Sequence, residues 1–264
     1  MAETSEIWTG KASSYDRARP APPPALLDLL TQLIDIPHPT LVVDLGSGTG
    51  LSTALWSEQA ERVIGIEPNA DMRQEALYKI ETHPHAAHIE YREGLAHQTG
   101  LSDGCADIVT AAQSFHWMEP TATLAEIVRI LRPGGLFAAY DYDTPPAIHW
   151  ELDRLAQEGT SRLMELVRER GLAQNFKIWP KNKSLDPLRE SGHFRFTREV
   201  LLHHIEQGDA TRFLAMMQSS AFSSQFQFTD QELGLDRLRD AAFQYIGSKP
   251  IPWYWSYRVR IGIK

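Results

Sequence analysis

The feature that most constrains the fold is a regular alternation of short apolar runs and amphipathic helical segments between residues 41 and 140. Short, mostly apolar runs bounded by turn residues, such as residues 41–45 and 62–66, are typical of strands buried on both faces. The segments between these runs repeat apolar residues at helical spacing, and Pro133-Gly134-Gly135 ends one of them. This order predicts βαβ units, and therefore an α/β fold with a doubly wound, mostly parallel sheet covered on both faces.

The rest of the chain follows a different pattern. Apolar residues at helical spacing predict a helix over residues 152–167, and residues 194–205 contain an expected strand. Two helix starts are predicted farther on, one at Asp209 and one at the capping box Thr229-Asp-Gln-Glu232. From residue 253 onward, apolar and polar residues alternate with period two, which predicts a closing strand.

Composition excludes several classes of function. The formal net charge is −8, which argues against nucleic acid as the main partner because phosphate binding needs a surplus of Lys and Arg. No apolar run is long enough to span a membrane, and the first residues lack the pattern of a secretory signal. The single cysteine, Cys105, allows neither an internal disulfide nor a cysteine-based zinc site. We expect a cytoplasmic protein that binds no metal, no membrane and no nucleic acid.

A glycine-rich loop, Gly46-Ser47-Gly48-Thr49-Gly50, directly follows the first buried strand. A phosphate-binding P-loop would need a Lys after its last glycine, and none is present. The dinucleotide fingerprint is also a poor match, because Leu51 stands where its third glycine belongs. Asp44 precedes the loop and would repel a pyrophosphate. The loop is better suited to a ligand that carries positive charge, such as a sulfonium with an ammonium group.

A second carboxylate, Glu67, ends the second strand about twenty residues beyond the loop, the separation at which an acidic residue binds ribose hydroxyls in this kind of fold. The alternative is that Glu67 is a solvated loop residue before Pro68. The glycine loop at the matching distance favours the ribose-binding interpretation.

With these motifs, the sequence resembles the class I S-adenosylmethionine-dependent methyltransferases. The segments that carry the resemblance are VVDLGSGTG (42–50), VIGIEPNADM (63–72), EGLA (93–96), DIVTAAQSFHW (107–117) and RILRPGGLFAAY (129–140). The segment Tyr15-Asp-Arg-Ala-Arg19-Pro20 further resembles the methyltransferase type 11 subgroup that includes trans-aconitate methyltransferase. The resemblance implies a Rossmann-like, seven-stranded, mostly parallel sheet with an antiparallel last strand and a helical lid insertion.

The resemblance also implies S-adenosyl-L-methionine as the cofactor, with S-adenosyl-L-homocysteine as the product. Gly46, Gly48 and Gly50 would then lie against the methionine part, and Glu67 would bind the ribose. Leu95 departs from the family, where a polar residue often stands to contact the adenine amino group. The implied cofactor-binding residues are Tyr15, Arg19, Asp44, Gly46, Ser47, Gly48, Gly50, Glu67, Pro68, Met72, Gly94, Leu95, Ala96 and Gln113.

Residues for the methyl acceptor are expected at the same edge of the sheet. His116 directly follows the fourth strand and has a pKa range suited to orienting or deprotonating a hydroxyl, although it could equally be a structural histidine. We expect His116 as the catalytic residue. The expected acceptor-binding residues are His116, Trp117, Tyr140, Tyr142, Trp150 and Trp253, the last of which could instead pack in the core.

The functional expectation is methyl transfer to a small molecule, most readily at the oxygen of a carboxylate or hydroxyl. The alternatives are N- or C-methylation, a related cofactor-dependent reaction such as cyclisation, and a non-enzymatic binding module. We expect a monomer or homodimer with one domain over residues 1–264. Its expected parts are a cofactor-binding core at about 36–142, a helical acceptor lid at about 145–192 and C-terminal strands and helices at 193–264.

Overall fold

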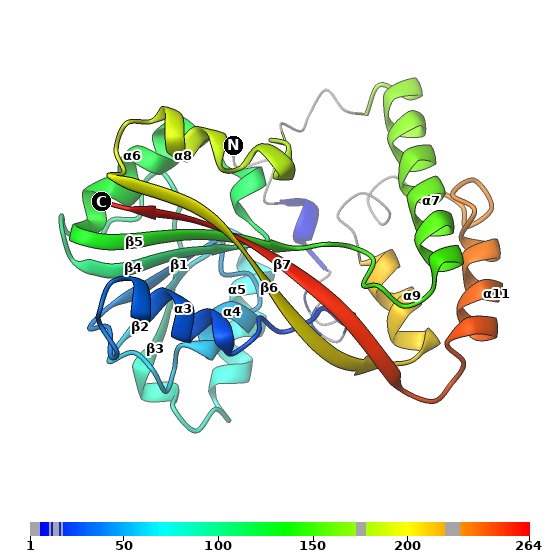
Figure 1. Ribbon diagram of the computed structural model, residues 1–264, viewed down its shortest axis with the longest axis horizontal. Helices are drawn as coiled ribbons and strands as arrows, with labels where there is room; N and C mark the ends of the chain where they lie inside the picture. Colours follow the sequence, from blue (N-terminus) through cyan, green and yellow to red (C-terminus); the bar gives the residue numbers. More distant parts are fainter. Residues whose placement is uncertain (1–5, 11, 13–15, 17, 173–177, 220–227) are drawn as a thin grey trace.

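The computed structural model describes residues 6–10, 12, 16, 18–172, 178–219 and 228–264 (Figure 1). Its centre is a seven-stranded sheet with the order β3-β2-β1-β4-β5-β7-β6. The strands are β1 (Val42–Leu45), β2 (Val63–Ile66), β3 (Ile89–Arg92), β4 (Ala106–Ala112), β5 (Leu131–Tyr142), β6 (Phe196–Gly208) and β7 (Ile251–Ile263). The α-helices used below are α3 (Ala25–Leu33), α4 (Leu51–Leu55), α5 (Ala70–Ile80), α6 (Pro120–Ile130), α7 (Trp150–Glu169), α8 (Asp186–Glu190), α9 (Ala210–Gln218) and α11 (Leu235–Tyr245).

The strand directions confirm the predicted fold class. Strands β1 to β5 are parallel, and in the register of the central strand Val42 stands opposite both Val63 and Ile108. Strand β7 is antiparallel to β5 and to β6, so the strand direction changes only at this side of the sheet. The result is a Rossmann-like α/β sheet, mostly parallel, with an antiparallel last strand.

Alternate residues of each strand face opposite sides of the sheet, and each side has its own apolar core. Val43 faces the side covered by α6 and α8, where Leu124 and Ile127 are buried. Val42 faces the other side, where Leu26 of α3 and Trp56 after α4 are buried. Both strand faces are therefore dry, which explains why these strands read as continuous apolar runs rather than alternating ones.

Strands β6 and β7 continue beyond the rest of the sheet as a two-stranded ribbon (Figure 1). The pairing of β5 with β7 ends at Tyr142 and Tyr257, whereas β7 begins six residues earlier, at Ile251. The extension packs against α7, α9 and α11 in a third core that includes Phe213 and Trp253. The helical cover is thus assembled from α7 in the expected insertion and from α9 and α11 in the C-terminal part.

Of the two helix starts predicted in the C-terminal part, the one at Asp209 is confirmed and the one at Thr229 is wrong. The Asp209 side chain accepts a hydrogen bond of 2.8 Å from the amide of Arg212 at the start of α9. Thr229 and Glu232 do exchange the hydrogen bonds of a capping box, with Thr229 N donating to Glu232 at 2.8 Å and Glu232 N donating to Thr229 at 3.2 Å. These bonds close a turn, and α11 begins only at Leu235, with Gly234 as its N-cap and no side-chain cap. Within the described residues, none of the helices has both the length and the apolar content needed to cross a bilayer.

Candidate functional site

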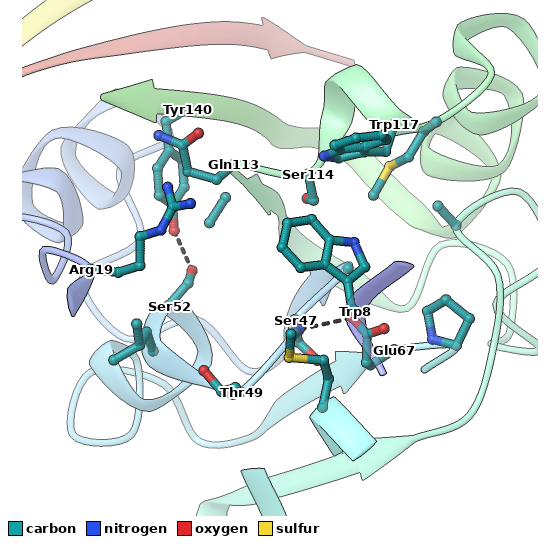
Figure 2. A pocket seen from close by; sticks show the side chains of 18 of the residues that line it. Trp8, Arg19, Ser47, Thr49, Ser52, Glu67, Gln113, Ser114, Trp117 and Tyr140 are labelled. Atoms are coloured by element: carbon teal, nitrogen blue, oxygen red, sulfur yellow. Dashed lines mark hydrogen bonds between the residues drawn. The ribbon is translucent and has the colours of Figure 1, made fainter. Parts of the chain in front are cut away.

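A pocket lies at the carboxyl ends of β1, β2, β4 and β5 (Figure 2), the edge at which open α/β sheets bind their ligands. Residues from the N-terminal segment and from β7 complete its wall. The pocket contains these residues expected from the sequence: Arg19, Gly46, Ser47, Gly48, Glu67, Pro68, Met72, Leu95, Ala96, Gln113, Trp117, Tyr140 and Tyr142.

The glycine loop has a backbone conformation that L side chains rarely adopt. Gly46, Gly48 and Gly50 have φ angles of +65°, +55° and +83°. A Cβ at Gly46 would lie 2.7 Å from Ser114 Cβ, whereas a Cβ at Gly48 would meet nothing within 4 Å. The amide of Gly46 donates to Ile66 O at 2.8 Å, which ties the loop to the end of β2. The loop is thus tied to β2 at Gly46. At Gly48, the backbone faces the pocket with no side chain covering it.

Asp44 is fully buried beneath this loop and is not part of the pocket wall. Its carboxylate accepts hydrogen bonds of 2.8 Å from the hydroxyls of Thr53 and Thr110. Burial raises the pKa of Asp44 from 3.8 to about 6, although these hydrogen bonds oppose the rise. In the structure, Asp44 therefore connects β1, α4 and β4 beneath the loop and is not itself a wall residue.

Glu67 lies at the end of β2 with 6 % of its surface exposed, and its side chain lines the pocket. Its two carboxylate oxygens accept hydrogen bonds of 2.8 Å from the amides of Gly48 and Asn69. Burial raises its pKa, and the two amide hydrogen bonds and Arg73 offset part of that rise. Each oxygen has a second lone pair, so the carboxylate can still accept hydrogen bonds from the hydroxyl groups of a ligand.

The opposite end of the pocket is polar and cationic. Arg19 Nη1 donates to the Tyr142 hydroxyl at 2.5 Å, and Nη2 donates to Ser219 O at 3.1 Å. Gln113 follows β4 with a φ of +52°, and its side-chain oxygen accepts a hydrogen bond of 2.5 Å from Lys181. Figure 2 shows Arg19, Gln113 and Tyr140 on one side of the pocket, away from Glu67.

His116 lies behind this end rather than in the wall. Only 7 % of its surface is exposed, and Nδ1 is 3.6 Å from Asp141 Oδ1. Asp141 also pairs with the buried Arg260 at 2.7 Å. Burial lowers the pKa of His116, and Asp141 offsets only part of that change. The neutral imidazole is thus favoured near pH 7.

Besides His116, two more of the expected acceptor residues lie outside the pocket wall. Trp150 is 70 % exposed at the start of α7 and stacks on His149. Trp253 is fully buried against Phe213 in the third core. The physical reason is the length of β7: residues 251–256 continue past the end of β5, which carries Trp253 away from the sheet edge.

Two expected glycines are also absent from the wall, and one expected residue is not described. Gly50 caps α4, and the Tyr91 ring fills the space next to it. Gly94 packs against Ile66, since a Cβ added at Gly94 would lie 3.0 Å from Ile66 Cγ2. Tyr15 lies outside the described residues.

Several wall residues were not foreseen from the sequence, among them Trp8, Ser52, Ser114, Met118 and Tyr257. Trp8 and Tyr257 are 249 positions apart, and no local motif marks either as a site residue. Ser114, in contrast, follows β4 next to Gln113, so the rule that ligands bind at carboxyl strand ends would have found it.

The pocket fits a cofactor built from a nucleoside and a charged amino acid. Open space faces Gly48, and a buried carboxylate with free lone pairs stands next to it. Beyond Glu67 the wall is apolar, formed by Pro68, Met72, Leu95 and Ala96, which suits the faces of a flat base. The fold and the pocket together are typical of α/β proteins that bind a nucleoside-containing cofactor.

Comparison with known proteins finds a family that matches part of the chain. Residues 43–139 match the family described as "Methyltransferase domain". An uncharacterized methyltransferase of Mycobacterium tuberculosis is 32 % identical over 122 residues, which is 46 % of either chain. The ubiquinone/menaquinone biosynthesis C-methyltransferase of Rubrivivax gelatinosus is 36 % identical over 107 residues, covering 39 % of this chain and 40 % of that one. The matched part thus spans less than half of these relatives.

Solved structures support the fold over almost the whole chain. A candidate type II methyltransferase from Anaeromyxobacter dehalogenans superimposes with a TM-score of 0.64 at 24 % identity, covering 93 % of this chain and 97 % of that one. A geranyl diphosphate methyltransferase solved with S-adenosylmethionine has the same fold, with a TM-score of 0.50 at 15 % identity, covering 91 % and 84 %. The fold is thus that of class I S-adenosylmethionine-dependent methyltransferases. The resemblance to the trans-aconitate subgroup stays a prediction.

Proposed function

We propose that this protein is a methyltransferase that uses S-adenosyl-L-methionine and methylates a small molecule at the oxygen of a carboxylate or hydroxyl. The observation that carries the proposal is the junction of Gly48 and Glu67, where bare backbone and a buried carboxylate face one pocket at the carboxyl edge of the sheet. The methyltransferase domain at residues 43–139 contains both residues.

The wall residues fit the two halves of the cofactor. The loop at Gly46 and Gly48 would hold the amino-acid half, Glu67 the ribose hydroxyls, and Met72 with Leu95 the base. When bound, S-adenosylmethionine supplies a methyl group on a sulfonium, which is already activated for displacement. The protein then has to orient the acceptor and exclude water, and correct orientation alone can be worth about 7–11 kcal/mol.

The cationic end of the pocket supports an anionic or hydroxylated acceptor. Arg19 carries a permanent charge there, and Lys181 is hydrogen-bonded to Gln113 in the wall. Tyr142 and Tyr257 add polar aromatic surface. A carboxylate is already ionised at neutral pH and needs no general base, whereas a hydroxyl acceptor does.

Titration calorimetry tests the cofactor. The wild-type protein should bind S-adenosylhomocysteine, and Glu67→Ala should weaken binding by about 2 kcal/mol because a charged acceptor is lost. Glu58→Ala is the matched control, since the Glu58 side chain is 77 % exposed, is not part of the pocket wall and lies 3.3 Å from His85. Equal affinity in the wild type and Glu67→Ala would remove Glu67 from the site, and no binding by the wild type would refute the cofactor.

Transfer of a labelled methyl group tests the acceptor. The labelled cofactor is incubated with panels of carboxylic acids, phenols and amines, and label is expected in the oxygen acceptors. Label only in amines, or on carbon, would overturn O-methylation. The predicted base role of His116 is tested on the acceptor found: His116→Ala at the full wild-type rate would eliminate it.

A further inference from the structure

Trp8 lies across the pocket, although no sequence motif marks it. It belongs to the short 3-10 helix η1 (Glu6–Trp8) and lines the pocket. Figure 2 shows its indole between Glu67 on one side and Ser114 and Trp117 on the other. The ring therefore lies at the end of the pocket where Glu67 stands, and not at the end where Arg19 stands.

The position of Trp8 is fixed from both sides. Two residues that follow it are held by the start of α5: Gly10 N donates to Asp71 Oδ2 at 2.8 Å, and Asn69 Nδ2 donates to Thr9 Oγ1 at 3.0 Å. The side-chain oxygen of Asn69 caps α5 as well, so this anchor stands next to Glu67. On the other side the Trp8 ring meets the Trp117 ring edge to face, with 5.9 Å between centroids and 84° between planes.

The chemistry around the indole suits one kind of ligand. Pro68, Met72, Leu95 and Ala96 form an apolar wall in the same part of the pocket, and Glu67 is the carboxylate there. A nucleoside has a flat base with apolar faces and a sugar with adjacent hydroxyls. An aromatic ring, an apolar wall and one carboxylate match those two parts.

We propose that Trp8 is a cofactor-binding residue that covers the nucleoside half of the ligand and packs against its base. This inference rests on the function proposed above and adds the residue that completes that half of the site. Stacking of a base on an aromatic side chain is worth about 1–3 kcal/mol by alanine substitution, and the middle of that range corresponds to a loss of affinity of at least tenfold.

Calorimetry with two ligands tests the proposal. S-adenosylhomocysteine contains the nucleoside and the amino acid, and 5′-methylthioadenosine contains the nucleoside without the amino acid. Trp8→Ala should weaken both by the same factor, about tenfold or more, because both carry the base. Trp8→Phe should retain most of the affinity, since an aromatic face remains.

The control is Tyr78→Ala, which removes an aromatic side chain that is 70 % exposed on α5 and is not part of the pocket wall. It should bind both ligands as the wild type does. A Trp8→Ala affinity within twofold of the wild type, a tighter affinity, or a loss confined to S-adenosylhomocysteine would each overturn the proposal. A wild type that binds neither ligand would instead refute the proposed function, so the two failures are distinguishable.

Discussion

Two buried carboxylates under the pocket differ in what they touch. Glu67 lines the pocket and accepts hydrogen bonds from backbone amides, which leaves it lone pairs for a ligand. Asp44 accepts hydrogen bonds from the hydroxyl groups of Thr53 and Thr110 and lies below the loop. Asp44 thus links elements inside the fold. Its ionisation changes the stability of the loop directly, and any effect on a ligand is indirect.

Asp44→Asn tests this connection through its pH dependence. The pKa of about 6 in the folded protein exceeds the ordinary 3.8, so the folded state holds the proton more tightly than the unfolded state. The contribution of Asp44 to stability is therefore full below about pH 4 and is lost as the pH rises through about 6. Two pKa units correspond to about 3 kcal/mol.

The measurement is urea unfolding of both proteins from pH 4 to pH 7.5. Relative to Asp44→Asn, the wild type should lose about 3 kcal/mol of unfolding free energy across this range. Curves for the two proteins that remain parallel at every pH would show that Asp44 does not titrate in this window.

At the scale of elements, a local signal predicted the start of α9 because a cap acts within one turn. Asp209 before α9 is such a signal, and α9 in turn carries Phe213 and Met216 into the third core. The cap matters more here than on an isolated surface helix, since fraying of α9 would expose this apolar face.

Asp209→Ala should lower the unfolding free energy by about 1 kcal/mol, because the Arg212 amide loses its acceptor. Asp209→Asn keeps a side-chain oxygen and should restore most of this. Both are measured by chemical denaturation. Equal losses in the two variants would mean that the carboxylate charge, rather than the cap, stabilises α9.

The same scale shows why some residues could not be placed from the sequence. Alternation around Trp253 and Trp255 correctly predicted a strand and its two faces. It carried no information on where the neighbouring strand β5 ends, so the position of Trp253 along the ribbon came out wrong. The rule that ligands bind at the carboxyl ends of parallel strands placed Glu67 and Gln113 at the pocket, because each of these residues directly follows a strand. Trp8 reaches the pocket through tertiary contacts alone, which no periodicity encodes.

At the scale of the whole molecule, β7 runs through two cores. Ile261 lies in the sheet core that contains Val42, and Trp253 lies in the core of the helical cover. A strand shared in this way couples the two parts, since neither can unfold without unpairing part of β7. We therefore expect the helical cover and the sheet to unfold together, as the single domain predicted from the sequence.

Phe213→Ala tests this coupling, because Phe213 is fully buried in the core of the helical cover and belongs to neither of the two cores on the faces of the sheet. It should lower the unfolding free energy by about 3–5 kcal/mol and shift one common transition. Far-ultraviolet circular dichroism and tryptophan fluorescence should give the same midpoint. Two separate transitions, with only the first one shifted, would mean that the cover is an independent unit.

The pocket wall joins residues as far apart in the chain as Trp8 and Tyr257. Contacts between distant chain positions form late, because closing a long loop costs entropy before any contact is gained. A partly folded chain therefore has strands and helices but no complete binding wall. A ligand of this pocket would bind only the finished fold and would raise its melting temperature with increasing ligand concentration.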